Sequence, residues 1–317
     1  MKITVAICTW NRCESLRQTL QEMCSLEIPA GVEWELVVVD NNSTDDTRHV
    51  VETFMARLPI RYVFEPVQGL SHARNRAVAE ANGEYILWTD DDVLVSRNWM
   101  EAYVSAFKRH PEAAFFGGPV EPWFEGEPPK WLAETAIKLL GGAFAVRDLG
   151  RHERQLGCGE DDLPFGANYA LRMDWQRRYQ YDVRLGVKGA ARVHGEETRL
   201  LEEILKDGGQ GYWVPEALVR HWIPKIRQTT AYLWRYYFGA GRTEFLVSYP
   251  FPEVPAAKLW FGVPRWTLRA VVENTVRYAL YRLTRPQEVW VPALARMARS
   301  WGFWYEWWKQ RGRARDE

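Results

Sequence analysis

The chain of 317 residues has few cysteines and no long apolar run, and both features limit what it can be. Its four cysteines, Cys8, Cys13, Cys24 and Cys158, show neither CxxC nor CxxH spacing, which argues against a zinc site and a disulfide framework. No stretch approaches the ~20 apolar residues of a membrane-spanning helix. The amino terminus also lacks a charged and then apolar leader. We therefore expect a cytoplasmic protein with reduced thiols.

The chain also has no net charge, because 41 Lys and Arg residues balance 41 Asp and Glu residues. The balance hides an asymmetry between two parts of the chain. Residues 1–224 hold 25 Lys and Arg against 34 Asp and Glu, a difference of −9, whereas residues 225–317 hold 16 against 7, a difference of +9. The basic carboxyl-terminal part indicates a negatively charged partner.

The most informative segment that is present is an acidic triplet. Asp90, Asp91 and Asp92 follow the apolar run 85–88. On an extended strand, Asp90 and Asp92 point to one side and Asp91 points to the other. Two carboxylates on one side suit Mg²⁺ or Mn²⁺. The alternative is an acidic turn that precedes the next helix.

Apolar, β-branched segments alternate with helical ones in the first part of the chain. Strands are expected near 3–8, 35–39, 60–64 and 84–88, and helices near 13–25, 44–57, 70–82 and 97–109. This alternation predicts an α/β fold with a mostly parallel sheet flanked by helices. Ligands of such sheets collect outside the carboxyl ends of the strands, where Thr9, Asp40 and the acidic triplet are expected.

Several segments, in this order, resemble the nucleotide-sugar domain of family 2 glycosyltransferases. They are Thr9-Trp10-Asn11-Arg12, Val38-Val39-Asp40-Asn41-Asn42-Ser43-Thr44-Asp45, Gly69-Leu70-Ser71-His72-Ala73-Arg74-Asn75, the acidic triplet, Phe165-Gly166-Ala167-Asn168, Gly195-Glu196-Glu197-Thr198-Arg199-Leu200 and His221. The resemblance implies a GT-A fold, which is a Rossmann-like domain, and a reaction that inverts the anomeric centre. It implies a catalytic domain over 1–224, with a donor-binding half at 1–118 and an acceptor-binding half at 119–224.

The resemblance also implies roles for individual residues in binding the donor. Asp92 is the expected ligand of Mn²⁺ or Mg²⁺ in a DXD motif, Asp90 shares the metal or reaches the ribose, and His221 approaches the metal or the diphosphate. Asp40 accepts a hydrogen bond from the base, and Arg74 holds phosphate or base. The full set expected to bind the donor is Thr9, Asn11, Arg12, Asp40, Asn42, Arg74, Asp90 and Asp91. For His221 a purely structural role stays open.

An inverting transfer needs a base that takes the proton of the acceptor hydroxyl. Glu197 matches the family's catalytic acid, where an aspartate is usual, so the longer side chain is a departure and Glu196 is the reserve. Acids at a helix amino terminus are also favoured by the helix dipole alone. Gly166 and Asn168 lie where the family shapes the acceptor site, although a turn explains them equally well.

Residues 225–317 are expected to form helices broken at prolines, among them Pro264, Pro286 and Pro292. Apolar residues at helical spacing run from Trp290 to Trp308, with arginines around them. A basic, Trp-rich helix is typical of peripheral membrane contact, here through residues 286–315. The alternative is that the stripe packs on the catalytic domain or on a second copy in a homo-oligomer.

The sequence therefore predicts a metal-dependent glycosyltransferase, located in the cytoplasm or at the inner face of the cell membrane. Its donor is a UDP-, dTDP- or GDP-sugar, and its acceptor is a saccharide or lipid-linked intermediate of surface polysaccharide assembly. One alternative is a sugar nucleotidyltransferase, although the segment 8–11 lacks the glycine-rich phosphate loop expected of one. Another is a non-enzymatic protein that binds membranes or nucleic acid. No nucleic-acid partner is expected of the transferase.

Overall fold

The computed structural model describes residues 1–132, 134–157, 159, 161–188, 191–192, 195–249, 255, 258–260 and 262–316. Cys158 and the prolines at 250 and 252 lie outside the described residues. The chain divides into two compact units. The sheet unit comprises Met1–Trp123, Phe144–Gly189 and Gly195–Trp222, and the helical unit comprises Phe124–Ala143, Ala190–His194 and Ile223–Glu317. Residues 124–143, which the sequence placed in the acceptor-binding half, belong to the helical unit, and the division at residue 224 stays a prediction.

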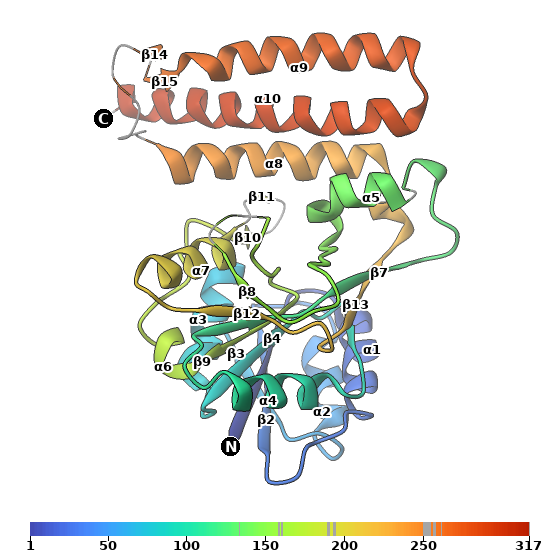
Figure 1. Ribbon diagram of the computed structural model, residues 1–317, viewed down its shortest axis with the longest axis vertical. Helices are drawn as coiled ribbons and strands as arrows, with labels where there is room; N and C mark the ends of the chain where they lie inside the picture. The colour runs from blue at the N-terminus through green and yellow to red at the C-terminus, as the bar shows by residue number, and fades with distance from the viewer. Residues whose placement is uncertain are drawn as a thin grey trace. The chain divides into compact units, whose positions relative to one another are not determined.

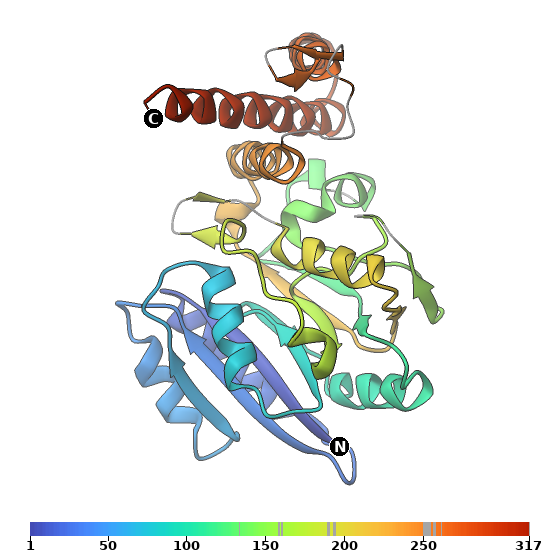
Figure 2. The same cartoon turned by 90° about the vertical axis from the view of Figure 1, so that its left-hand side faces the viewer.

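The sheet unit begins with four parallel strands and the helices between them (Figures 1 and 2). The strands are β1 (Lys2–Thr9), β2 (Glu33–Asp40), β3 (Ile60–Phe64) and β4 (Tyr85–Thr89), and the helices are α1 (Cys13–Met23), α2 (Thr47–Phe54), α3 (Leu70–Glu80) and α4 (Trp99–Arg109). The predicted α/β alternation is therefore confirmed. Each element lies within three residues of its expected bounds.

Further strands extend this sheet, which has eight strands among the described residues in the order β3-β2-β1-β4-β9-β6-β12-β8. The added strands are β6 (Phe115–Gly117), β8 (Arg154–Leu156), β9 (Asn168–Arg172) and β12 (Gly211–Trp213). Because β9 runs antiparallel to both β4 and β6, the sheet is mainly, rather than wholly, parallel. A smaller sheet has the order β5-β13-β7, formed by β5 (Val93–Val95), β13 (Val219–Ile223) and β7 (Val120–Phe124).

Alternation along the central strands builds a core on each face of the large sheet. Val5 and Val38 belong to the core that α1, α2 and α4 cover. Ala6 and Val39 belong to the opposite core, which α3 and α7 (Glu196–Lys206) cover. With both faces covered, the polar carboxyl ends of β1, β2 and β4 are left as the place where charged side chains gather.

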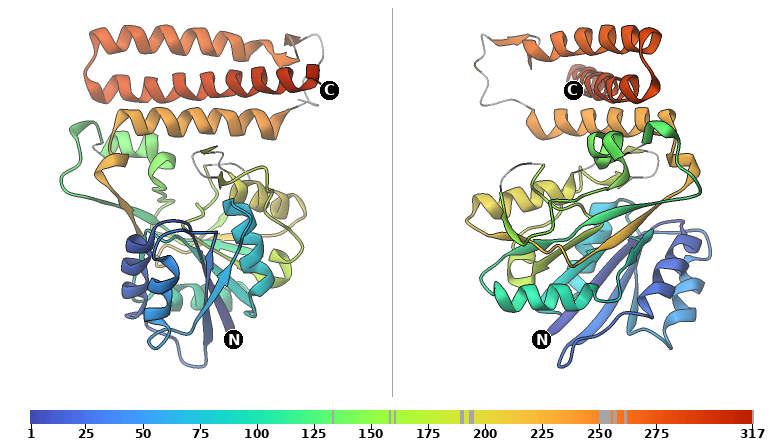
Figure 3. Two further views of the ribbon diagram at one scale, coloured as in Figure 1. Left: turned by 180° about the vertical axis from the view of Figure 1, so that it is seen from behind. Right: turned by 45° about the vertical axis from the view of Figure 1, so that its right-hand side comes forward.

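The helical unit is built around three long helices, α8 (Thr230–Ser248), α9 (Arg265–Thr284) and α10 (Gln287–Asp316), with α10 between the other two (Figures 1 and 3). Glycines let α8 and α10 approach closely, because a Cβ on Gly241 would overlap the carbonyl oxygen of Arg299. A Cβ on Gly302 would overlap that of Phe238. The short elements of the two units that remain are α5 (Glu134–Leu140), α6 (Met173–Gln176), β10 (Val187–Lys188), β11 (Ala191–Arg192), β14 (Leu259–Trp260), β15 (Val263–Pro264) and 3₁₀ turns at Lys130–Leu132, Gly141–Phe144 and Lys225–Arg227. Of these, α6 and β10 belong to the sheet unit.

The structure corrects one expectation for the carboxyl-terminal part and refines another. The predicted break at Pro292 is wrong, since Pro292 lies inside α10, where proline loses one hydrogen bond but its neighbours Val291 and Ala293 are buried. The apolar stripe of α10 divides in two. Its first half, with Leu294 and Met297, is buried among the helices. Its second half is exposed at Trp301, Tyr305 and Trp308.

None of the helices in the described part of the chain combines the length and apolar character needed to cross a membrane.

Candidate active site

The carboxyl ends of β1, β2 and β4 bring the predicted site residues to one edge of the sheet. Thr9 and Asp40 are the last residues of β1 and β2 and are partners in the register of these strands. β4, which pairs with the other side of β1, ends at Thr89 and is followed directly by the acidic triplet. The convergence expected from strand order is therefore present.

The acidic triplet lies in a turn between β4 and β5, so the strand alternation assumed for it does not apply. Asp91 and Asp92 both accept hydrogen bonds from the guanidinium of Arg12. Its Nη1 donates to Asp91 Oδ1 at 2.6 Å, and its Nη2 donates to Asp92 Oδ2. Thr9 Oγ1 donates to Asp91 Oδ2 at 2.8 Å. Burial raises the pKa of Asp91 to about 6, although the charge of Arg12 opposes this shift. Burial raises the pKa of Asp90 as well.

His221 reaches Asp92 from the neighbouring strand. It lies on β13, opposite Val93 of β5, and its Nε2 is 3.3 Å from Asp92 Oδ2. Its Nδ1 is 2.5 Å from the carbonyl oxygen of Phe144. A carbonyl only accepts, so Nδ1 carries the proton and Nε2 is directed at the carboxylate. An imidazole held this way by a backbone carbonyl is the usual arrangement of a metal-binding histidine.

Asp92 and His221 fit a divalent cation, because a carboxylate and an oriented imidazole both suit Mn²⁺. Among the described residues, no group of three or more His, Cys, Asp and Glu side chains is arranged to hold a metal ion. The protein therefore offers a pair of ligands, and water and phosphate would have to complete the shell, as is common for Mg²⁺ and Mn²⁺.

The loops after β1 and β2 are tied together beside the triplet. Asn11 and Asn42 adopt the left-handed conformation, with φ of 50° and 65°, which asparagine tolerates better than most residues. The Oδ1 of Asn11 accepts from the backbone N of Thr44 at 2.7 Å, and its own backbone N donates to Ser43 Oγ at 2.9 Å. The side chain of Asn11 thus positions the second loop.

Asp40 is buried at the end of β2 and receives two hydrogen bonds. The backbone N of Ser43 donates to Oδ1 at 2.9 Å, and the hydroxyl of Tyr62 donates to Oδ2 at 2.8 Å. Each carboxylate oxygen has capacity for a further bond, so the predicted contact with a base is compatible with this geometry. Tyr62, on β3, is a site residue that the sequence did not reveal, because a tyrosine on a strand resembles any other core residue.

The two candidate bases begin α7 and share one arginine. Nη1 of Arg74 lies 3.4 Å from Glu196 Oε1 and 3.9 Å from Glu197 Oε2. Glu197 Oε1 also accepts from the backbone N of Gly166 at 3.2 Å. Burial and then the charge of the adjacent Glu197 raise the pKa of Glu196 to about 7, and the charge of Arg74 opposes this shift. Glu196 is 5% exposed and Glu197 is 14% exposed at the side chain, so the second glutamate is the more accessible.

Arg74 has an aromatic environment that the sequence did not predict. It is buried above the rings of Trp88, Tyr169 and Tyr181, at 5.7, 5.8 and 5.4 Å from their centroids. Within this aromatic surround it contacts the glutamates of α7, and its predicted role toward phosphate or base stays a prediction. The three rings were not predicted to belong to the site, since aromatic side chains are ordinary in a core.

The two predicted acceptor residues have different surroundings. A Cβ on Gly166 would overlap the guanidinium of Arg74, so glycine lets the backbone pass close to this side chain while its N donates to Glu197. Asn168 has no exposed surface, and its side chain bonds Trp99, Tyr103 and the carbonyl oxygens of Pro119 and Ala217. With all four of its hydrogen-bonding positions used inside the protein, Asn168 holds strands together beneath the predicted acceptor surface.

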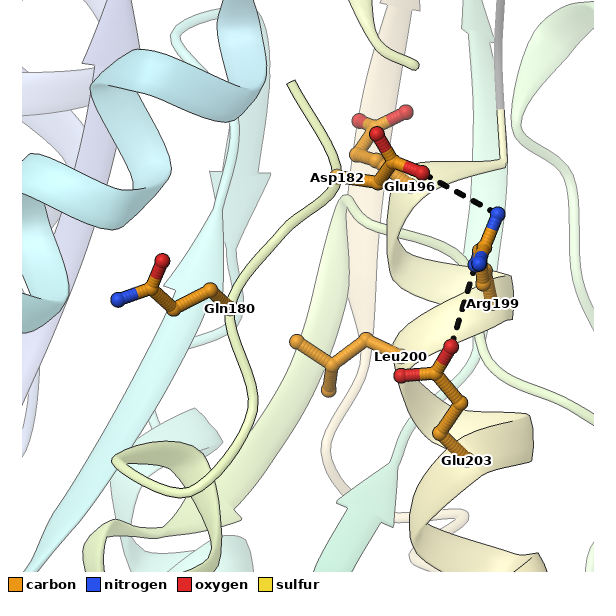
Figure 4. Close-up of a pocket in the computed structure, with 6 residues that line it drawn as sticks. All are labelled: Gln180, Asp182, Glu196, Arg199, Leu200 and Glu203. Atoms are coloured by element: carbon orange, nitrogen blue, oxygen red, sulfur yellow. Dashed lines mark hydrogen bonds and ion pairs between the residues drawn. The ribbon is translucent and has the colours of Figure 1, made fainter. Parts of the chain in front are cut away.

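A pocket of about 160 Å³ opens beside Glu196 (Figure 4). Arg199 crosses it, with Nη1 3.1 Å from Asp182 Oδ2 and Nε 3.1 Å from Glu203 Oε1. Gln180 and Leu200 complete the lining. Apart from Leu200 the lining is polar and mostly acidic, which suits hydroxyl-bearing ligands better than apolar ones.

A mainly parallel sheet with acids at the ends of β2 and β4, and with a paired acid at the start of a later helix, is the architecture of GT-A glycosyltransferases. Residues 4–160 match the profile of glycosyl transferase family 2. The succinoglycan biosynthesis protein ExoM of Rhizobium meliloti (strain 1021) is 26% identical over 249 residues, which are 77% of this chain and 74% of that protein. The chain belongs to family 2 of the glycosyltransferases and has the GT-A fold.

Solved structures agree with the fold. The mannosyltransferase PcManGT from Pyrobaculum calidifontis, in complex with GDP-Man and Mn²⁺, superimposes with a TM-score of 0.62 at 18% identity, covering 97% of this chain and 87% of that one. Residues 1–349 of S. aureus TarS give a TM-score of 0.52 at 14% identity, covering 98% of this chain and 92% of that one. The family assignment removes the nucleotidyltransferase and non-enzymatic alternatives.

Proposed function

We propose that the chain transfers a sugar from a nucleoside diphosphate sugar to a saccharide or lipid-linked acceptor of surface polysaccharide assembly, with inversion at the anomeric carbon. The names of similar proteins support the substrate classes. PcManGT was solved with GDP-Man and Mn²⁺, and TarS with UDP at a TM-score of 0.51. ExoM is named for succinoglycan biosynthesis, and TarS is named as a poly(ribitol-phosphate) β-N-acetylglucosaminyltransferase.

The observation that carries the proposal is the different environment of the two glutamates. Glu197 is the more accessible and is oriented by the backbone N of Gly166. In the proposed step, Glu197 takes the proton of the acceptor hydroxyl. The acceptor oxygen then bonds to the anomeric carbon, the bond from that carbon to the phosphate oxygen breaks, and the nucleoside diphosphate leaves with the electron pair. Arg74, which lies near both glutamates, acts as a positioning residue for Glu197.

At the other end of the site, Asp92 and His221 would hold Mn²⁺ or Mg²⁺, which would neutralise charge on the leaving diphosphate. The chain itself supplies further positive charge there through Arg12, whose guanidinium lies on Asp91 and Asp92. Asp40 accepts a hydrogen bond from the base of the nucleotide. An ionised carboxylate accepts only, so it suits the N–H of uracil or thymine, or the N1–H and amino group of guanine.

We place the reaction in the cytoplasm, in keeping with the free thiols of Cys8, Cys13 and Cys24. A donor screen tests the proposal. The intact protein is mixed with UDP-, dTDP- and GDP-sugars, with and without Mn²⁺, and the melting temperature and the release of nucleoside diphosphate are measured. One nucleotide class should raise the melting temperature and be hydrolysed slowly in the presence of Mn²⁺. No shift and no release with any of the three classes would refute the proposal.

A further inference from the structure

Helix α9 contacts α10 partly through polar side chains. Asn274 Nδ2 donates to Ser300 Oγ of α10 at 2.8 Å, and Trp301 Nε1 of α10 donates to Thr275 Oγ1 at 3.1 Å. Val271 is the apolar residue of α9 that is buried. A helix that packs in a bundle normally directs its apolar residues at its neighbours. The contact of α9 with α10 therefore includes hydrogen bonds as well as Val271 and the rings of Tyr278 and Trp290, whose centroids are 6.2 Å apart.

Four apolar residues of α9 form a row on its exposed face. Val272, Val276, Leu280 and Leu283 follow one another at steps of four, four and three residues, which places them along one side of a helix. They are 56%, 61%, 55% and 85% exposed. Trp266, at the start of the helix, is 59% exposed. Single exposed apolar residues are ordinary, but a continuous row of them marks an interaction surface.

Arginines accompany this row. Arg265, Arg269 and Arg277 are all exposed, and the acid beside them, Glu273, is paired with Arg269 at 2.6 Å. The whole segment 225–317 carries a formal charge of +9. The outer surface of α9, defined by the apolar row with Trp266 and these arginines, is called the α9 face below.

We propose that the α9 face docks on an anionic lipid bilayer. The apolar row would enter the boundary between headgroups and acyl chains, and the arginines would reach the lipid phosphates. A second copy of the chain fits less well, because the arginines of two copies would share one interface while the acid beside them, Glu273, is already paired with Arg269. This assignment differs from the membrane contact predicted for residues 286–315, since half of the α10 stripe is buried.

The test is co-sedimentation of the intact protein with vesicles of phosphatidylcholine containing phosphatidylglycerol, or of phosphatidylcholine alone. Val276→Ser, Leu280→Ser and Leu283→Ser are combined in one variant. Its matched control replaces three exposed residues outside α9, namely Val67→Ser, Val183→Ser and Ile226→Ser, which are 48%, 52% and 73% exposed. A second variant combines Arg265→Gln with Arg277→Gln.

The wild type and the matched control should sediment with anionic vesicles and much less with neutral ones. The triple variant should bind at least about tenfold more weakly, and each arginine removed should cost about fivefold at low salt. High salt should weaken the arginine contribution alone. The arginine variant keeps the test decisive if the triple variant fails to fold, which circular dichroism would reveal.

The proposal is overturned if the wild type stays in the supernatant with anionic vesicles, or if the triple variant binds as well as its control. It is also overturned if sedimentation velocity shows a dimer that only the triple variant dissociates, because the α9 face would then join two copies. None of these results depends on the proposed sugar transfer, and hydrolysis of the donor in solution should be equal in the triple variant and its control.

Discussion

The sheet unit buries charged side chains, whereas the helical unit exposes apolar ones. In the sheet unit, charged groups are buried against one another, as Arg12 is with Asp91 and Asp92. In the helical unit, a row of apolar residues is exposed on α9, while Asn274 on the side toward α10 is hydrogen-bonded to Ser300. Buried charge is costly unless it is paired, and exposed apolar surface is costly unless it is covered. Under the two proposals made above, each departure is a binding surface, for a charged substrate in the sheet unit and for a lipid surface in the helical unit.

The largest effect on the sheet unit should come from Asp92→Ala. Turnover should fall by more than about 10³-fold, because a bound cation contributes several kcal/mol of charge stabilisation. Nucleotide binding measured by calorimetry should lose its dependence on Mn²⁺. Asp161→Ala, at an exposed acid outside the triplet, is the control and should behave as the wild type. Unchanged Mn²⁺-dependent binding in the Asp92 variant would move the cation elsewhere.

Glu197→Gln should lower kcat by about 10²- to 10⁴-fold, the usual contribution of a general base. Donor affinity should stay unchanged, because the amide fills the same space and Gly166 can still donate to its oxygen. Glu196→Gln is the matched comparison and should lose much less activity. If Glu196→Gln shows the larger loss of kcat, the roles assigned to the two glutamates are reversed.

In the helical unit, Gly302→Ala tests whether the bundle is tightly packed behind its exposed face. The added methyl group would overlap the carbonyl of Phe238 on α8, so unfolding free energy should fall by roughly 1–3 kcal/mol. Thr284→Ala, at the exposed end of α9, should change it little. A melting temperature for Gly302→Ala equal to that of the control would mean that α8 and α10 are loosely joined.

The smallest effect concerns the pH dependence of stability. Burial and Glu197 raise the pKa of Glu196 to about 7 from an ordinary value of 4.5, against the charge of Arg74. Between these pH values the folded chain holds a proton that the unfolded chain has released, so stability from this group falls as pH rises. Glu196→Gln should therefore flatten denaturation curves measured between pH 5 and 8, by on the order of 1 kcal/mol. An identical slope in both proteins would remove this role for Glu196.

The sequence predicted the sheet well because its central strands are buried on both faces and its helices have one apolar side. The run from Leu36 to Val39 is apolar and largely β-branched, a composition that favours a buried strand over a helix. The order of acids at the ends of β2 and β4 also followed from the pattern. Strand alternation failed at Asp90 to Asp92, because the chain turns there and a turn follows no periodicity.

Other features depend on contacts between residues far apart in the sequence. The aromatic surround of Arg74 draws on residues 88, 169 and 181, and the carbonyl that orients His221 comes from Phe144. The spacing of residues along the chain does not predict such long-range contacts. The division of the α10 stripe depends likewise on which helices pack against it, so the stripe was visible in the sequence and its burial was not.

The most direct test of the central claim is the configuration of the sugar that the enzyme transfers. Once the donor screen has identified a nucleotide sugar, NMR of the product gives the one-bond coupling constant between the anomeric carbon and its proton, and the α-linked donor provides the reference. The account predicts that an α-linked donor yields a β-linked product, because Glu197 activates the acceptor for one displacement. A product that keeps the α configuration would contradict the single-displacement mechanism and the role of Glu197.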